Sequence, residues 1–347
     1  MRKIIVIYVF AFSFFACKKK EVGPQRVDGA PYYQQEGSKV VVGCEGNFGW
    51  GNASMSVYNT ETKMNVNQVF NTQNNLPLGD VFQSATLFNG DLFIVVNNSN
   101  KIEVVDTINF ISKGTITGLT SPRYFMGVSQ SKAYVSDLYA NAITIVNPTT
   151  FQIAGTISVS DWTEQMVLLN QTAYVTQKGT NQVLLIDVVT DAIVDSITVG
   201  REPNSLVLDA FDNLWVLCSG GVNEVTPSLV QINTTTNTVM KNLLFNSPSE
   251  SPNNLQIDTS KTQLLYLNDN LYQQSITETA INNNPILNAG NTVFYGLGVN
   301  PYNNEIYLSD AIDYVQAGKV YRYSPTMSLI DDFTTGIIPQ DFTFLEN

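Results

Sequence analysis

A loop rich in glycine and asparagine carries two large aromatic side chains near the start of the chain. The residues EGNFGWGN occupy positions 45–52, between the apolar run VVVG and the alternating run SMSVYN. Glycine and asparagine tolerate positive φ angles and therefore indicate a tight, shaped loop. Phe48 and Trp50 either pack down onto neighbouring strands or remain accessible as an apolar surface for a partner molecule.

Composition excludes several kinds of chemistry. The chain of 347 residues has no histidine, which removes histidine metal ligands, histidine general bases and every triad that needs one. It shows neither a P-loop nor a dinucleotide-binding fingerprint. A net charge of −12 and a pI near 4.4 argue against nucleic acid, whose affinity comes from neutralised phosphates. We therefore predict a protein that is not an enzyme and has no catalytic residues, metal or catalytic cofactor.

The first residues predict a lipoprotein signal peptide over 1–16. A basic start, MRK, precedes the apolar run IIVIYVFAFSFF, and Ala16 stands before Cys17. The apolar run is too short to span a membrane. Cleavage before Cys17 would free that cysteine for lipidation, and residues 17–38 would form a flexible tether. An uncleaved anchor or an ordinary secretory signal is the alternative.

A short apolar strand recurs along the rest of the chain, usually with an aromatic residue at its second position. The aromatic residues are 41, 40, 41, 51 and 41 residues apart. The run VVVGCEG, at 40–46, is a seventh copy that lacks the aromatic residue. The other copies are LFIVVNN (92–98), AYVSD (133–137), AYVTQ (173–177), LWVLC (214–218), LYLND (265–269) and IYLSD (306–310).

Each copy belongs to a unit of four short strands about 44 residues long, with D/N-x-x-T turns. This long period predicts an all-β domain at 39–347, a seven-bladed β-propeller with four-stranded antiparallel blades. The first blade has only three strands of its own, so the C-terminal run FTFLEN should close the ring as its innermost strand. Cys44 and Cys218 then occupy the same position in opposite blades, which predicts two free, buried thiols.

One face of this ring concentrates the unusual residues. Loops that enter the innermost strand of a blade and loops that leave its second strand lie on the same face. That face collects two of the three tryptophans and two of the three arginines of the propeller, whereas the other face consists mostly of plain turns. The predicted ligand-binding residues are Asn47, Trp50, Asp80, Gln83, Asn97, Arg123, Tyr124, Trp162, Gln165, Arg201, Asn204, Asp310, Tyr314 and Gln316.

Two family resemblances sharpen this prediction. The repeat at 173–209 resembles the surface-layer type YVTN repeat, which is specific for fold. A second likeness covers nearly the whole domain and resembles a family of lipid-anchored seven-bladed propellers that partner TonB-dependent transporters and capture vitamin B12 and related corrinoids. Its motifs are EGNFGWGNASMSVYN, LGDVFQSATLFNGDLFIVVNNSNKIEVVD, SPRYF, LWVLCSGG, SDAIDYVQAGKVYRYS and GIIPQDF.

The resemblance implies capture of a corrinoid at the outer membrane, on the cell surface, and its delivery to a TonB-dependent transporter. A corrinoid is a broad disc edged with amides, which suits neutral donors and acceptors flanked by aromatic residues. An arginine would meet the phosphodiester of its nucleotide loop. The cobalt needs no protein ligand, so the corrinoid would be a ligand and not a cofactor. The run KKKE after Cys17, in place of acidic residues, leaves a periplasmic location open.

Two other classes of protein remain open. A scaffold or adhesin would bind protein or glycan on the same face. A metal-dependent propeller hydrolase could use Asp80, Glu164, Asp310 and Asp313 around a cation, whereas the Asp-box repeats of sialidases are missing. Haem or siderophore capture has no motif in this sequence.

Overall fold

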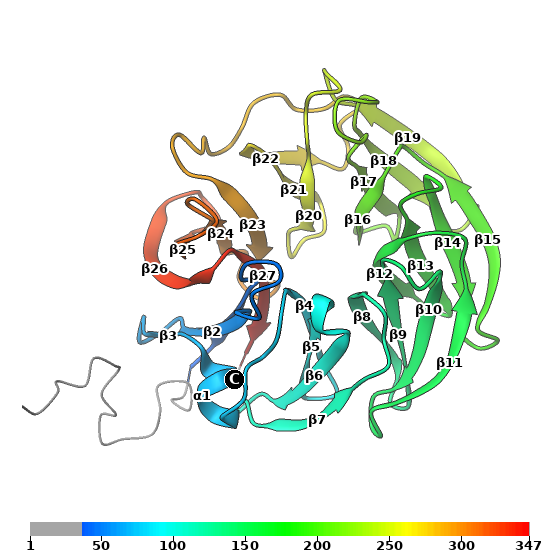
Figure 1. Cartoon of the computed structure of the whole chain (residues 1–347). Coiled ribbons are helices and arrows are strands. Elements are labelled where there is room, and N and C mark those ends of the chain that lie inside the picture. The colour runs from blue at the N-terminus through cyan, green and yellow to red at the C-terminus, as the bar shows by residue number, and fades with distance from the viewer. Residues whose placement is uncertain (1–36, 347) are drawn as a thin grey trace, which may run out of the picture. The chain divides into compact units, whose positions relative to one another are not determined.

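The computed structural model describes residues 37–346, and residues 1–36, with the predicted signal peptide, Cys17 and most of the tether, lie outside the described part. Seven antiparallel sheets follow one another around a ring (Figure 1). This confirms the predicted seven-bladed β-propeller. We number the blades along the ring and name the strands of each blade from the innermost outwards.

Blade 1 consists of β27 (Pro339–Leu345), β1 (Lys39–Cys44), β2 (Ser54–Asn59) and β3 (Asn65–Val66). Blade 2 has β4 (Phe82–Phe88), β5 (Asp91–Val96), β6 (Lys101–Asp106) and β7 (Ser112–Ile116). Blade 3 has β8 (Pro122–Ser129), β9 (Lys132–Asp137), β10 (Ala142–Asn147) and β11 (Gln152–Ser158). Blade 4 has β12 (Thr163–Leu169), β13 (Thr172–Gln177), β14 (Gln182–Asp187) and β15 (Ala192–Thr198).

Blade 5 consists of β16 (Pro203–Leu208), β17 (Leu214–Cys218), β18 (Ser228–Asn233) and β19 (Thr238–Leu244). Blade 6 has β20 (Asn253–Ile257), β21 (Gln263–Asn268) and β22 (Asn270–Ser275). Blade 7 has β23 (Phe294–Val299), β24 (Ile306–Asp310), β25 (Ala317–Tyr323) and β26 (Leu329–Ile337). A short helix, α1 (Val69–Asn74), connects blades 1 and 2, and a 3-10 turn, η2 (Asn97–Ser99), joins β5 to β6.

The ring closes by pairing the two ends of the propeller. Strand β27 lies antiparallel to β1, with Val41 opposite Thr343 and Lys39 opposite Leu345. In Figure 1 the red C-terminal strand lies beside the blue N-terminal strands. The predicted closure is therefore confirmed, and it removes the open edge that the first and last blades would otherwise leave.

Blade 6 departs from the four-strand pattern. Its sheet contains three strands, and outside β22 only an isolated bridge between Leu271 and Leu287 continues the pairing. Tyr266 also packs differently from the aromatic residues that the repeat aligns with it. Its ring contacts Phe245 of blade 5, whereas Tyr134 and Trp215 pack toward the blade that follows their own. Neighbouring strand residues face opposite sides, so the repeat alignment is one residue out of step in this blade.

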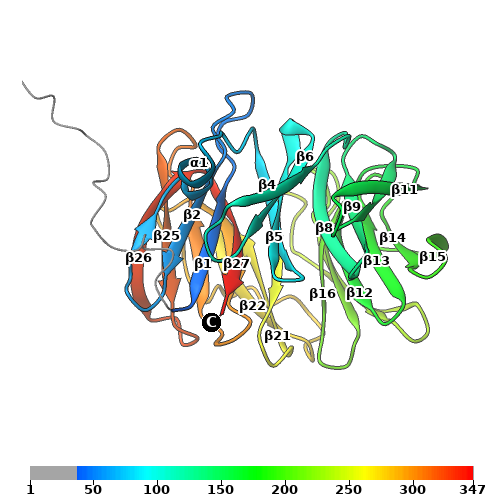
Figure 2. The same cartoon turned by 90° about the horizontal axis from the view of Figure 1, so that it is seen from below.

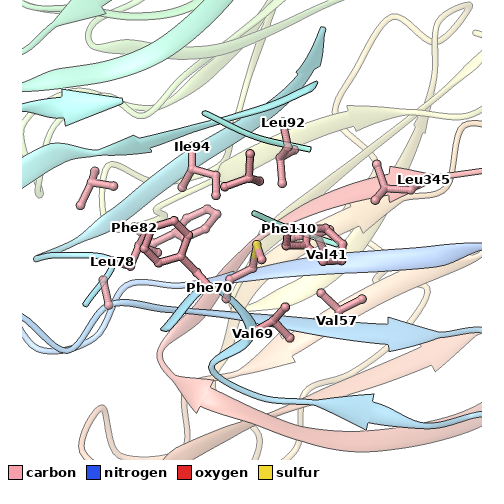
Figure 3. Close-up of a cluster of buried hydrophobic side chains, with 14 residues drawn as sticks. Val41, Val57, Val69, Phe70, Leu78, Phe82, Leu92, Ile94, Phe110 and Leu345 are labelled. Atoms are coloured by element: carbon pink, nitrogen blue, oxygen red, sulfur yellow. The ribbon is translucent and has the colours of Figure 1, made fainter. Parts of the chain in front are cut away.

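Apolar side chains fill the interfaces between neighbouring blades. Figure 3 shows the cluster between blades 1 and 2, where Val41, Phe82 and Ile94 belong to one buried group. Gly43 belongs to this interface because a Cβ there would lie 2.0 Å from the Phe82 ring. The blades therefore approach too closely for any side chain at that position.

Two faces of the ring are distinguished by their connections, as Figure 2 shows from the side. The loop face holds the loops that enter the innermost strands and leave the second strands. The turn face holds the turns after the third strands, where a single side chain closes each turn. Asn147 Oδ1 accepts hydrogen bonds from the Thr149 and Thr150 amides at 2.9 and 3.1 Å. Asp187 and Asn233 do the same in the next two blades, which confirms the predicted turns.

Cys44 and Cys218 are free and fully buried at the ends of β1 and β17. Burial raises the pKa of the two thiols to about 11 and about 12. The prediction of two free, buried thiols is confirmed. Among the described residues, no helix has the length and apolar character needed to cross a membrane.

Candidate ligand-binding face

Every innermost strand has an irregularity at its loop-face end. The register with the second strand shifts there in all seven blades, as between Pro203 and Ser205 or between Phe82 and Ser84. Bulges of this kind redirect side chains at the rim of a sheet. The second residue of each innermost strand is polar: Gln83, Arg123, Glu164, Asn204, Asn254, Tyr295 and Gln340.

Arg123 is the centre of the first part of a hydrogen-bonded network across this ring. Its guanidinium donates to both carboxylate oxygens of Glu164 in blade 4, at 2.9–3.1 Å, and to the side chain of Gln83 in blade 2. Gln340 of blade 1 donates from Nε2 to the Gln83 carbonyl at 2.9 Å. Residues of four successive blades are therefore joined.

The network continues through the remaining blades. Gln165 Oε1 accepts from the Leu206 amide at 3.2 Å, and Ser205 Oγ accepts from the Leu255 amide at 3.3 Å. Asn254 Nδ2 donates to the Tyr295 carbonyl at 2.7 Å. The Tyr295 hydroxyl then donates to Glu45 of blade 1 at 2.8 Å, which completes the circuit. The polar ring thus ties neighbouring blades together.

Carboxylates beside this network are held away from bulk water. Burial raises the pKa of Asp341 to about 7, although its Oδ2 accepts a hydrogen bond from the Ala85 amide at 2.9 Å. Burial likewise raises the pKa of Glu45, and the bond from Tyr295 opposes it. The Asp341 carboxyl group beside the ring therefore changes its protonation near neutral pH.

Exposed apolar side chains surround the polar ring on the loop face. Phe48 and Trp50 are 75% and 79% exposed, and Tyr139 and Val222 on other loops are 71% and 87% exposed. Figure 2 shows the β1–β2 loop projecting beyond the strands. Phe48 and Trp50 therefore do not pack into a core, and they form an accessible apolar rim.

Hydrogen bonds hold the aromatic loop in place despite its exposure. The Gly49 amide donates to Asp80 Oδ2 at 2.8 Å, and Asn47 Nδ2 donates to the Tyr314 carbonyl of blade 7 at 2.7 Å. Gly49 and Gly51 adopt positive φ angles in open space. The loop shape is thus fixed by Asp80 and Asn47, while the aromatic side chains remain free.

Several predicted ligand-binding residues serve the framework. Asn97 is buried and donates to Ser121 and to the Pro122 carbonyl, and Asp310 accepts from the Val293 and Ile312 amides. Gln316 donates to Asp313 within its own loop. These side chains shape the loops. Trp50, Tyr314 and Gln316 are exposed, and the partly exposed residues are Tyr124, Trp162, Gln165, Arg201 and Asn204.

The cations of this face are already paired. Arg123 binds Glu164, Arg201 forms an ion pair with Glu224, and Lys178 lies 3.5 Å from Glu202. Lys178 also stands 4.1 Å from the ring centre of Trp162, a cation–π distance. A phosphodiester would meet these arginines in competition with carboxylates, and the predicted arginine contact stays a prediction.

Sequence reasoning missed Glu45, Asn254, Tyr295, Gln340 and Asp341. The signal was present, because four of them occupy the same or the next position of an innermost strand as Gln83 and Arg123. Within residues 37–346, no group of three or more Cys, Asp and Glu side chains is placed to hold a metal ion. Asp80, Glu164, Asp310 and Asp313 do not gather in one.

The fold and this face define a seven-bladed β-propeller with a polar ring and an apolar rim on one side. The chain belongs to the family described as a domain of unknown function, DUF5074, whose profile matches residues 39–335. No curated protein matches it.

Similar solved structures share the fold alone, since their sequences are 11–13% identical. A quinonprotein alcohol dehydrogenase-like protein from Bacteroides thetaiotaomicron has a TM-score of 0.69 over 87% of this chain and 77% of its own. A functionally unknown protein from Desulfotomaculum acetoxidans has a TM-score of 0.65 over 90% and 99%. Kuenenia stuttgartiensis hydrazine synthase has a TM-score of 0.62 over 77% and 95%.

Proposed function

We propose that this protein is a non-enzymatic binding protein that captures a corrinoid on its loop face. Anchored to the outer membrane through a lipid on Cys17, it delivers the corrinoid to a TonB-dependent transporter. It has no metal and no catalytic cofactor of its own, and its lipid anchor is its sole attachment to the membrane.

The observation that carries this proposal is the pairing of an apolar rim with a ring of amides. Trp50 and Tyr314 offer flat apolar surface to the corrin ring, and their loops are joined by the Asn47–Tyr314 bond. Gln165 and Asn204 offer neutral donors and acceptors of the kind that amide side chains of a corrinoid require. An accessible apolar rim of this kind suits a broad disc.

The charged side chains of the loop face indicate which kind of corrinoid would bind best. Because Arg123 and Arg201 are both paired with carboxylates, an anionic phosphodiester would have to compete with Glu164 and Glu224. Recognition of a corrinoid through the amides at its edge does not require either ion pair to break. Cobinamide, which lacks the nucleotide loop, should therefore bind at least as well as cyanocobalamin.

Calorimetry tests the proposal directly. Cyanocobalamin and cobinamide are titrated into the purified protein, and the double variant Trp50→Ala/Tyr314→Ala is compared with it. We expect saturable one-to-one binding to the unaltered protein and at least a tenfold loss of affinity in the variant. Absence of heat and of a thermal shift with both corrinoids would refute the proposal.

A scaffold that binds another protein on the same face is the second candidate. The specific observation is that Phe48, Trp50 and Val222 are exposed on loops that leave the second strands of their blades. Exposed aromatic residues grouped on one face are typical of protein contacts. Capture of a transporter from solubilised outer membranes without any corrinoid would favour this role.

A further inference from the structure

A small polar cavity lies on the flank of the ring between blades 5 and 6. It has a volume of about 60 Å³, and its walls come from the end of β19, from β21 and β22, and from the segment at 281–283. Lys241 of β19 donates to the Ile276 and Glu278 carbonyls at 2.7 and 3.0 Å, which fastens the preceding segment at 276–278 against blade 5. The sheet of blade 6, which lines the cavity, has three strands.

Tyr266 places an unused hydroxyl group in the wall of this cavity. The side chain is 0% exposed, and its hydroxyl has no hydrogen-bond partner among the described residues. The aromatic residues that the repeat aligns with it are satisfied: the Tyr174 hydroxyl donates to the Thr234 carbonyl at 3.4 Å, and Trp215 Nε1 donates to Asp209 at 3.0 Å. A buried hydroxyl without a protein partner costs free energy unless a water molecule or a ligand group in the cavity supplies the hydrogen bond.

The remaining walls of the cavity are mostly neutral and polar. Four asparagines and Tyr272 supply both donors and acceptors, and Glu250 is the one carboxylate that lines it. Glu250 is oriented by the Asn246 amide at 2.8 Å, and Asn246 Nδ2 donates to Asn283 at 2.7 Å. This mixture suits hydroxyl groups, which donate and accept at once, and it disfavours anions. The asparagines are Asn246, Asn268, Asn282 and Asn283.

We propose that this flank cavity binds a neutral sugar unit of a glycan, with one hydroxyl-bearing edge of the sugar inserted against Tyr266 and Glu250. The cavity holds only a few water molecules, so it admits a hydroxymethyl group or two neighbouring hydroxyls and leaves the rest of the sugar on the surface. Asn246 and Glu250 belong to the loop that enters β20, so the site lies at the outer edge of the loop face. It does not depend on capture of a corrinoid.

The test titrates glucose, galactose and N-acetylglucosamine into the full protein and follows the sugars by saturation-transfer difference NMR and calorimetry. We expect at least one of the three sugars to bind, and the variant Tyr266→Phe, which keeps the ring, to lower its affinity at least tenfold. Tyr174→Phe is the matched control, because it removes a hydroxyl from the same kind of strand in blade 4. It should leave sugar affinity unchanged.

Glu250→Gln provides a second variant that keeps the shape of the cavity. It should lower sugar affinity at least fivefold while the protein unfolds at the same temperature. Absence of binding by all three sugars at millimolar concentration would overturn the proposal. Binding that survives in both Tyr266→Phe and Glu250→Gln would also overturn it.

Discussion

Asn147, Asp187 and Asn233 perform one task in three successive blades on the turn face: each closes a turn by accepting two backbone amides. At the loop face the repeat behaves differently. The corresponding position of the innermost strand is Gln83, then Arg123, then Glu164, and each makes its own contacts. Repetition therefore marks what every blade needs in order to fold, and variation between blades marks where the ring acquires a particular chemistry.

The variants that follow test this contrast. If it is correct, changes to the polar ring alter stability strongly or make it depend on pH. Changes to a turn should lower the unfolding free energy by a moderate amount that is similar in each blade. Changes to the exposed rim should alter ligand binding alone. The four variants are taken from the largest expected effect on stability to the smallest.

Arg123→Met should have the largest effect on stability. It leaves the Glu164 carboxylate, which is only 5% exposed, without its bidentate partner. Breaking one side of a buried ion pair costs about 3 kcal/mol of unfolding free energy, measured by denaturant titration. The double variant Arg123→Met/Glu164→Met should recover most of that loss. If Arg123→Met alone lowers the unfolding free energy by less than about 1 kcal/mol, the network does not stabilise the fold.

Asp341→Asn should change how stability depends on pH. The native pKa of about 7 lies above the ordinary value of 3.8, so the native state holds this proton more tightly than the unfolded chain does. The stabilising effect is complete below about pH 4 and is lost as the pH rises to about 7. At pH 8 the variant should therefore be more stable than the unaltered protein. Because solvent screens this partly exposed carboxyl group, we expect a gain on the order of 2 kcal/mol, about half of what the full pKa shift would give.

The same comparison at pH 4 is the control for Asp341→Asn. There the two proteins should unfold at the same denaturant concentration, because asparagine can still accept the Ala85 amide bond. A constant difference at both pH values would mean that packing, and not titration, distinguishes the variant.

Asn147→Ala should lower the unfolding free energy by about 1 kcal/mol, because two backbone amides of the turn lose their acceptor and bond to water instead. Thermal unfolding measures the loss. Asn233→Ala should cost a similar amount, since the turn is the same. Corrinoid affinity should not change in these two variants, and a change would break the separation between the faces.

Trp50→Ala should have the smallest effect on stability, within about 0.5 kcal/mol, because the side chain is 79% exposed. Its effect should appear in calorimetry as weaker corrinoid binding. A large loss of stability without any loss of affinity would assign Trp50 to the framework.

The sequence predicted the parts of the molecule that repeat. The spacing of Tyr134, Tyr174 and Trp215 predicted the blades, and the unpartnered C-terminal strand predicted the closure between β27 and β1. The sequence did not predict that blade 6 has three strands or that Tyr266 faces blade 5. A local insertion shifts the strand by one residue, and the apolar residues of that strand fit either face of the sheet.

The candidate site was predicted at the level of the face and only partly at the level of residues. Loop connectivity placed Trp50 and Tyr314 correctly on the exposed rim. It did not reveal that Arg123 is occupied by Glu164, nor that Glu45 and Tyr295 join blades 7 and 1. Such contacts depend on which side chains meet across blade boundaries, and these pairs are between 41 and 250 residues apart in sequence.

Hydrogen–deuterium exchange with and without saturating cobinamide tests the central claim most directly, because it reports on both faces at once. The account predicts slower exchange in the loops at 45–52, 137–141 and 310–316 and unchanged exchange in the turns at 107–111, 148–151 and 234–237. Protection confined to the turn face, or no protection in the presence of bound cobinamide, would contradict the assignment of the loop face as the site of capture.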